Sequence, residues 1–134
     1  MNELAAEIQV LRDAYAALNR NDIPAFMAIF DPHIHRIEFP DSPNGGTYHG
    51  IEAVTAHVTR ARATWAEGTC EPERFEVVSD CIIVITHVHV RLKNETTWRE
   101  GRVADVFAFR NGKVTDFHSF ADGAQALAWA HAND

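Results

Sequence analysis

The stretch from residue 103 to residue 120 reads VADVFAFRNGKVTDFHSF. Two runs of β-branched and aromatic residues flank the dipeptide Asn111-Gly112, and this dipeptide between alternating apolar residues is the strongest short signal for a β-hairpin. Because side chains alternate between the two faces of a strand, Asp105 shares a face of the first run with Val103 and Phe107. The pattern therefore predicts a hairpin with a lone carboxylate on an apolar face.

The same composition extends on both sides of this hairpin. Strands are predicted over residues 74–79, 82–92, 97–110 and 113–120, with short polar connectors between them. Short connectors favour pairing in chain order, as an antiparallel meander. After the last strand, Asp122 with Gln125 three residues later resembles a capping box, which predicts a short C-terminal helix through Trp129.

The N-terminal half is predicted to be mostly helical. Apolar residues recur at spacings of three and four over residues 2–19, 22–30 and 51–65, with Gly68 closing the third helix. A strand is expected over residues 33–39, followed by a loop rich in proline and glycine. Three helices followed by a meander indicate an α+β fold in which the helices cover one face of a curved antiparallel sheet.

Composition limits the class of protein. With 134 residues the chain is predicted to form one domain over residues 1–134, and its net charge of −7 makes nucleic acid an unexpected partner. No stretch approaches the ~20 apolar residues of a membrane span, and the start lacks a secretory pattern, so a cytoplasmic location is expected. Cys70 and Cys81 are expected to be reduced.

Three segments carry a resemblance to a known superfamily: AYAALNRNDIPAFMAIFDPHIHRIEFP (14–40), YHGIEAVTAHV (48–58) and VADVFAFRNGKVTDFHSFADGAQAL (103–127). They are similar to the nuclear transport factor 2-like superfamily, in particular to its SnoaL-like polyketide cyclase and ketosteroid isomerase branches. The resemblance implies a cone-shaped roll, a small-molecule pocket around Asp105 and a homodimer that pairs through the outer face of the sheet. It implies no single reaction, because the superfamily includes isomerases, cyclases, dehydratases, hydrolases and binding proteins.

The steroid isomerase pattern is only partly present when it is carried over by position. Asp105 and Phe107 match the strand motif Asp-x-Phe that contains the pocket acid of that family. The position of the catalytic base falls on Phe39, and the tyrosine donor falls on Ala14, one residue before Tyr15. Neither a phenyl ring nor a methyl group exchanges protons, so steroid isomerisation by that mechanism is not expected.

The chain contains eight histidines, which raises the question of a metal site. His87 and His89 form one His-x-His pair and His33 and His35 another, a spacing that places both rings of a pair on one side of a strand. A metal site needs at least a third protein ligand, and none is evident, so no metal is predicted. His118 is a candidate base by the resemblance, and a surface or interface histidine is the alternative.

Besides Asp105 and His118, further side chains are candidates for lining the pocket. Which face of strand 82–92 points inward stays open at this point, because the register is not fixed. The ligand-binding candidates are Tyr15, Phe30, Phe39, Tyr48, His87, His89, Val103, Phe107, Phe117 and Ser119.

No dinucleotide, phosphate-loop, serine-hydrolase or thiol-redox motif occurs in the sequence. The expected function is therefore cofactor-free acid–base catalysis on a small apolar molecule, of the isomerase, cyclase, dehydratase or hydrolase type, with Asp105 as acid or base. One alternative is a binding or accessory module that uses the same pocket without catalysis. Another is a structural dimer whose cone is filled by Phe39 and its neighbours.

Overall fold

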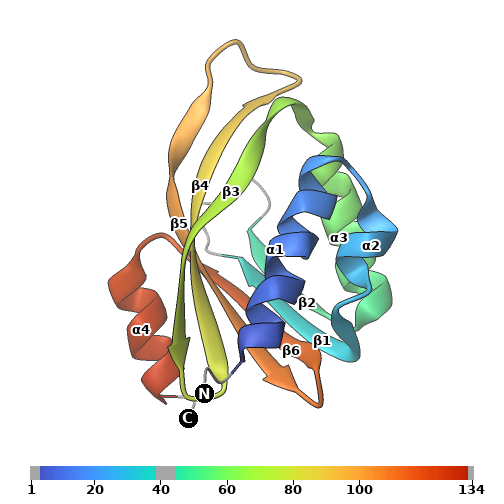
Figure 1. Ribbon diagram of the computed structural model, residues 1–134. Coiled ribbons are helices and arrows are strands. Elements are labelled where there is room, and N and C mark those ends of the chain that lie inside the picture. Colours follow the sequence, from blue (N-terminus) through green and yellow to red (C-terminus); the bar gives the residue numbers. More distant parts are fainter. Residues whose placement is uncertain (1–3, 39–44, 133–134) are drawn as a thin grey trace.

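A curved six-stranded sheet with the strand order β2-β1-β6-β5-β4-β3 lies at the centre of the fold (Figure 1). The computed structural model describes residues 4–38 and 45–132. The α+β class is confirmed. The strands are β1 (Phe30–Glu38), β2 (Gly46–His49), β3 (Trp65–Val78), β4 (Cys81–Leu92), β5 (Arg99–Arg110) and β6 (Lys113–Phe120).

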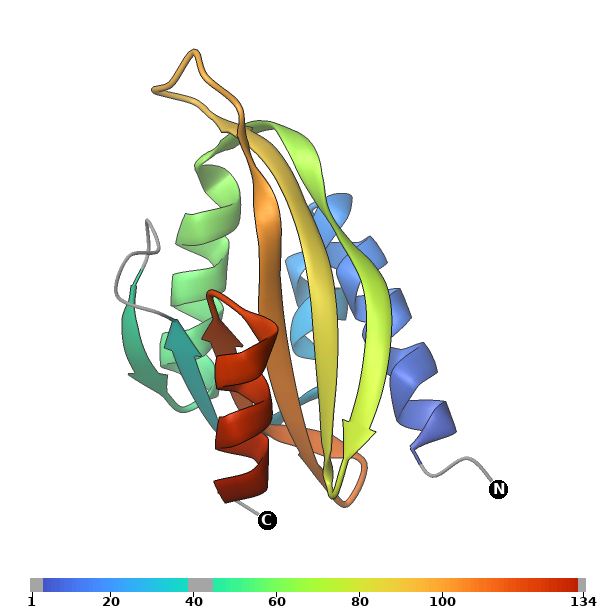
Figure 2. The ribbon, with the colours of Figure 1, turned by 90° about the vertical axis from the view of Figure 1, so that its left-hand side faces the viewer.

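Four helices lie on the two sides of this sheet. They are α1 (Ala5–Asn19), α2 (Ile23–Met27), α3 (Ile51–Ala63) and α4 (Gly123–Ala132). The first three lie on one face, here called the inner face, and α4 crosses the opposite, outer face (Figures 1 and 2). The side chain of Asp122 accepts a hydrogen bond from the backbone N–H of Gln125 at 2.8 Å, as the predicted capping box requires.

The predicted meander is confirmed for β3 to β6, which pair antiparallel in chain order. Asn111 and Gly112 have φ angles of 53° and 79°, and a tight two-residue hairpin turn of this kind needs positive φ at both positions. The register places Asp105 opposite Val84 on one side and Ser119 on the other. Directly opposed residues share a face, so these three side chains all point to the inner face.

The expectation of an all-antiparallel sheet was wrong at one pair, because β1 runs parallel to β6. A parallel neighbour needs a long crossover connection, and here the chain passes through β2, α3 and the meander before β6 returns beside β1. Arg36 lies opposite Phe117 and Ile37 opposite His118 in this pair. The parallel pairing therefore brings the end of β1 next to the end of β6.

Several predicted boundaries also differ from the structure. β2 forms within the expected loop, β1 begins three residues earlier than predicted, and β3 begins at Trp65 rather than at residue 74. Gly68 lies inside β3, close to a register shift between Trp65 and Glu67, and has a φ angle of +117°. A side chain at this position would collide with the backbone of His89, so this glycine permits a bulge in the strand rather than ending a helix.

Two hydrophobic clusters hold the layers together. The larger one lies between the inner face and helices α1–α3 and includes Leu11, Ile34 and Phe107. The smaller one lies under α4, where Ala126 and Ala130 let the helix approach the sheet closely. No helix in residues 4–38 and 45–132 is long and apolar enough to cross a membrane.

Candidate functional site

A cavity of about 230 Å³ lies between the inner face of the sheet and helices α1 and α3. Thr86, Val88, Val90 and Leu92 form part of its wall, which settles which face of β4 points inward. The other residues that line it include Tyr15, Arg36, Glu38, His57, Val58, Arg62, Trp65, Cys70, Arg99, Val103, Asp105, Phe117 and Ser119.

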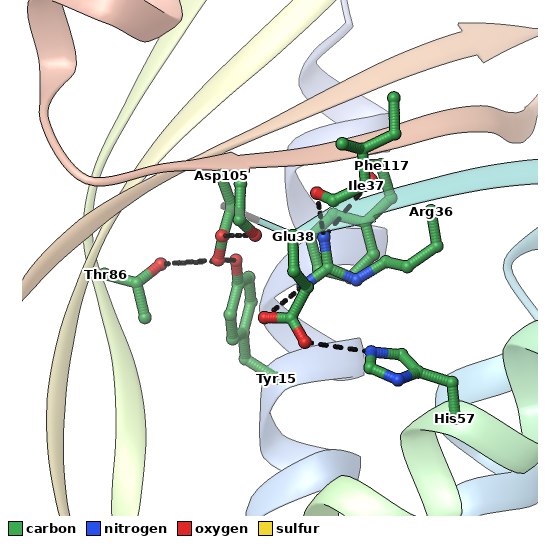
Figure 3. A network of polar contacts seen from close by, with 9 residues as sticks. Tyr15, Arg36, Ile37, Glu38, His57, Thr86, Asp105 and Phe117 are labelled. Atoms are coloured by element: carbon green, nitrogen blue, oxygen red, sulfur yellow. Dashed lines mark hydrogen bonds and ion pairs between the residues drawn. The ribbon is translucent and has the colours of Figure 1, made fainter. Parts of the chain in front are cut away.

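The carboxylate of Asp105 lies in the wall of this cavity and accepts hydrogen bonds from three hydroxyl groups. Tyr15 donates to Oδ2 at 2.5 Å, Ser119 donates to Oδ1 at 2.6 Å, and Thr86 donates to Oδ2 at 3.2 Å (Figure 3). All four residues are buried. The network joins α1 to three strands, because each of its four residues comes from a different element.

Burial is the main reason why the pKa of Tyr15 is raised well above its ordinary value, and the negative charge of Asp105 adds to the shift. The phenol therefore keeps its proton at neutral pH and remains a hydrogen-bond donor. Its ring also packs edge-on against Phe107, with the ring centroids 6.1 Å apart. Tyr15 is thus a protonated phenol at the cavity wall whose proton is donated to Asp105.

A second polar cluster lines the same cavity and centres on Glu38. Arg36 forms an ion pair with Glu38 at 3.1 Å, and Nε2 of His57 lies 2.9 Å from the other carboxylate oxygen (Figure 3). Arg36 also donates to the carbonyl oxygens of Ile37 and Phe117 and lies over the Phe117 ring, 3.7 Å from its centroid. Arg36 and Glu38 are two residues apart on β1, so strand alternation directs both inward.

The thiol of Cys70 is a further ionisable group in the cavity wall. Burial raises the pKa of Cys70 to about 12, with a further contribution from the charge of Asp105, while Arg62 acts in the opposite direction. A thiol with so high a pKa is not a nucleophile at neutral pH. Cys70 therefore contributes shape rather than reactivity.

The structure brings five of the predicted site residues together in the cavity: Asp105, Tyr15, Val103, Phe117 and Ser119. Three other candidates stand directly behind its wall. Phe30 and Phe107 stack on Phe117, with centroids 5.9 and 4.4 Å away, and the Tyr48 ring stacks on His57 at 3.9 Å. Phe39 lies outside the described residues.

The three histidines proposed for the site lie on the outer face, away from Asp105, which corrects the prediction of their position. His87 contacts Glu100 at 3.0 Å, and His89 stacks on Trp98. His118 packs against Phe120 and Trp129 under α4. The reason is the register, since residues adjacent to the inward-facing Thr86, Val88 and Ser119 must point outward.

The positional comparison with the steroid isomerases placed the tyrosine donor one residue too early in the sequence. Tyr15, and not Ala14, reaches Asp105 with its hydroxyl group. On β1 the carboxylate of Glu38 lines the cavity, next to the position that the comparison gave to the base. Arg36, Glu38 and His57 were missed by sequence reasoning, although two charged residues spaced by two on an apolar strand were a usable signal.

The described part of the chain holds no group of three or more His, Cys, Asp or Glu side chains arranged to hold a metal ion. The His35 and His49 rings stack on each other at 4.2 Å, and His35 contacts Asp116 at 3.5 Å in an exposed position.

The chain is similar in fold to solved nuclear transport factor 2-like proteins. One solved structure, an NTF2-like protein of unknown function from Burkholderia pseudomallei, is 28% identical, with 90% of this chain and 94% of that chain covered and a TM-score of 0.75. Bal32a, from a soil-derived mobile gene cassette, is 23% identical over 97% and 98% of the chains, with a TM-score of 0.78.

A protein with a ketosteroid isomerase-like fold from Catenulispora acidiphila, in complex with trimethylamine, is 15% identical over 91% and 92% of the chains, with a TM-score of 0.73. No curated protein matches the sequence. The family model of the SnoaL-like domain matches residues 11–117. The chain therefore belongs to the SnoaL-like domain family, as its sequence segments predicted.

Proposed function

We propose that this protein catalyses proton transfer at a carbon next to a carbonyl group, in a small and largely apolar molecule, without a cofactor. The observation that carries the proposal is that one cavity contains two polar clusters of different chemistry. One is a carboxylate, Glu38, held by Arg36 and His57, and the other is a hydroxyl, Tyr15, held by Asp105. Enolisation needs both a base and a donor that stabilises the developing oxyanion.

Glu38 is the proposed base. Arg36 forms an ion pair with its carboxylate, and the contact with His57 fixes its orientation on the cavity wall. Its side chain is only 14% exposed, so the carboxylate is largely shielded from bulk solvent. Arg36 and His57 are positioning residues in this scheme.

Tyr15 is the proposed donor to the carbonyl oxygen. Its raised pKa keeps the phenol protonated. In this structure Asp105 accepts that single proton, so the proton turns from Asp105 to the carbonyl oxygen when the substrate binds, while Thr86 continues to donate to the phenol oxygen. A buried hydroxyl donor of this kind stabilises the developing oxyanion. Asp105 then positions the donor, which differs from the acid or base role expected from the sequence.

The rest of the cavity wall supports a small apolar substrate. Val58, Val88 and Val90 lie along it, and the volume of about 230 Å³ is below the ~300–1,000 Å³ of pockets for drug-sized ligands. A non-catalytic binding module remains the second candidate. The binding-module hypothesis predicts that Asp105 is the only polar group of the cavity. The cluster of Arg36, Glu38 and His57 in the same cavity favours catalysis instead.

The test uses 2-tetralone, a small ketone with acidic α-protons, in D₂O at neutral pH. The wild-type protein should accelerate the loss of the α-proton signals in ¹H NMR above the buffer rate. Glu38→Gln should reduce this acceleration by about 10²- to 10⁴-fold, the usual contribution of a general base. Glu100→Gln is the matched control, because Glu100 contacts His87 at 3.0 Å on the outer face. A wild-type rate equal to that of buffer, or an unimpaired Glu38→Gln variant, would refute the proposal.

We also propose that the protein forms a homodimer through the outer face of the sheet. The Trp98 side chain, stacked on His89 at 4.4 Å, is 40% exposed there and is a large apolar group that a second copy could cover. Light scattering at micromolar concentration should give twice the 15.0 kDa mass of the chain. A monomer at all accessible concentrations would contradict this assembly.

A further inference from the structure

The three arginines that line the cavity differ in what balances their charge. Arg36 pairs with Glu38 at 3.1 Å, and Arg99 pairs with both carboxylate oxygens of Glu95 at 2.6 and 2.9 Å. Arg62 has no carboxylate within ion-pair distance among residues 4–38 and 45–132. The cavity wall therefore contains a guanidinium group that has no carboxylate partner among the described residues.

The position of Arg62 is explained by the end of a neighbouring helix. Its Nε and Nη2 atoms donate to the carbonyl oxygens of Leu18 and Asn19, at 2.8 and 2.9 Å, where α1 ends. These carbonyls lack partners inside the helix, so a cation is favourable there. The third nitrogen, Nη1, makes no hydrogen bond to any described residue. Helix capping thus uses two of the three guanidinium nitrogens.

The surroundings of Arg62 suit the carbon skeleton of an organic anion. Its guanidinium carbon lies 4.5 Å from the centroid of the Trp65 ring, and Trp65 and Leu92 line the same part of the cavity. Burial lowers the pKa of Arg62, as expected for a cation that has lost part of its hydration without gaining a carboxylate. An incoming anion would restore that lost stabilisation.

We propose that Arg62 binds the carboxylate group of the ligand, so that the substrate class is a small organic acid with an apolar body. This inference rests on the proposed function in that it takes the same cavity as the ligand site. The carboxylate of Asp105 repels a ligand carboxylate at its part of the cavity, whereas Arg62 attracts it. The ligand is therefore oriented with its anionic end at Trp65 and its other end toward Tyr15 and Glu38.

The test compares two probes of equal shape, 4-phenylbutyrate and 4-phenylbutyramide, by isothermal titration calorimetry. The carboxylate should bind the wild-type protein at least about 10-fold more tightly than the amide, as for a hydrogen bond to a charged group. Arg62→Gln should abolish this preference and Arg62→Lys should retain part of it. Arg60→Gln is the matched control, because Arg60 is an exposed arginine of the same helical turn that does not line the cavity.

Because Arg62→Gln also removes the cap of α1, a second measurement uses the wild-type protein alone. Raising NaCl from 50 to 500 mM should weaken binding of the carboxylate and leave binding of the amide unchanged. Equal affinities for the two probes, or a carboxylate preference that survives in Arg62→Gln, would overturn the inference. Absence of α-proton exchange with the carboxylate preference intact would refute the proposed catalysis and leave the anion site standing.

Discussion

Two histidine–glutamate contacts of nearly equal length lie on opposite faces of the same sheet. His57 and Glu38 are 2.9 Å apart on the inner face, with side chains 3% and 14% exposed. His87 and Glu100 are 3.0 Å apart on the outer face, with side chains 26% and 61% exposed. An exposed pair is screened by water and worth little, whereas a buried pair is strongly coupled to its surroundings. The distance alone therefore does not distinguish the two pairs, but burial beside the cavity does.

The largest expected effect is that of Arg36→Met, which removes the cation beside the inner pair. Glu38 would remain buried with only part of its compensation, and breaking a buried ion pair costs about 3–5 kcal/mol. Urea denaturation should show this loss in the free energy of unfolding. The matched outer change is Arg102→Met, which removes an exposed pair with Glu73 and should lower the free energy of unfolding far less, because water screens that pair. Equal losses in the free energy of unfolding for the two variants would show that burial does not distinguish the inner pair from the outer one.

The histidines themselves give the next effect in size. His57→Phe removes a buried donor to Glu38 and should lower the free energy of unfolding by about 2–3 kcal/mol. His87→Phe should change it by less than about 0.5 kcal/mol, because that ring is partly exposed. Chemical denaturation of both variants at pH 7.5 measures the difference. A neutral His57→Phe variant would show that the inner pair contributes no more than the outer one.

Alkaline pH should destabilise the inner face through Cys70. Since its pKa is raised to about 12 in the folded state, the unfolded chain loses the thiol proton first. Stability should therefore fall as pH rises through the interval from about 9 to 12, by about 1.4 kcal/mol per pH unit. Cys70→Ala should remove this component while the similar contribution of Tyr15 remains. Identical slopes for wild type and variant between pH 9 and 10.5 would contradict the raised pKa.

The smallest effect is expected for His118→Phe on the outer face. Partial burial, with a contribution from the charge of Arg36, lowers the pKa of His118, so the unfolded chain binds the proton first as pH falls. The wild-type protein should lose this part of its stability below about pH 6.5, and the variant should not. At pH 7.5 the change should stay within about 0.5 kcal/mol, because phenylalanine can keep the packing against Phe120 and Trp129. Denaturation at pH 5 and 7.5 tests both statements.

Most of the fold could be predicted because its signals are local. The alternation of residues 103–120 and the Asn111-Gly112 turn specify the hairpin, and the apolar spacing of residues 8–18 specifies α1. The parallel pairing of β1 with β6 could not be predicted in the same way. It depends on how distant segments meet, and no local pattern in β1 records its neighbour.

Only the part of the candidate site around Asp105 could be predicted from the sequence. Asp105 is conspicuous as a carboxylate among apolar residues on a single strand, and Ser119 follows from the register of the hairpin. The partnership of Glu38 with His57 joins a strand to a helix across the cavity, so it requires the packing of α3 on β1. His87, His89 and His118 were wrongly predicted to line the cavity. Their residue type suggests acid–base chemistry, but only the strand register decides which face of the sheet a side chain occupies.

The claim that the inner face holds the functional site is tested most directly by ¹H–¹⁵N chemical-shift mapping with 2-naphthol, a planar analogue of the enol of 2-tetralone. Saturable shifts should cluster at Tyr15, Glu38, His57 and Asp105, and they should disappear in Tyr15→Phe. Shifts that cluster instead around His87, His89 and His118, or an absence of saturable shifts at millimolar ligand, would contradict it.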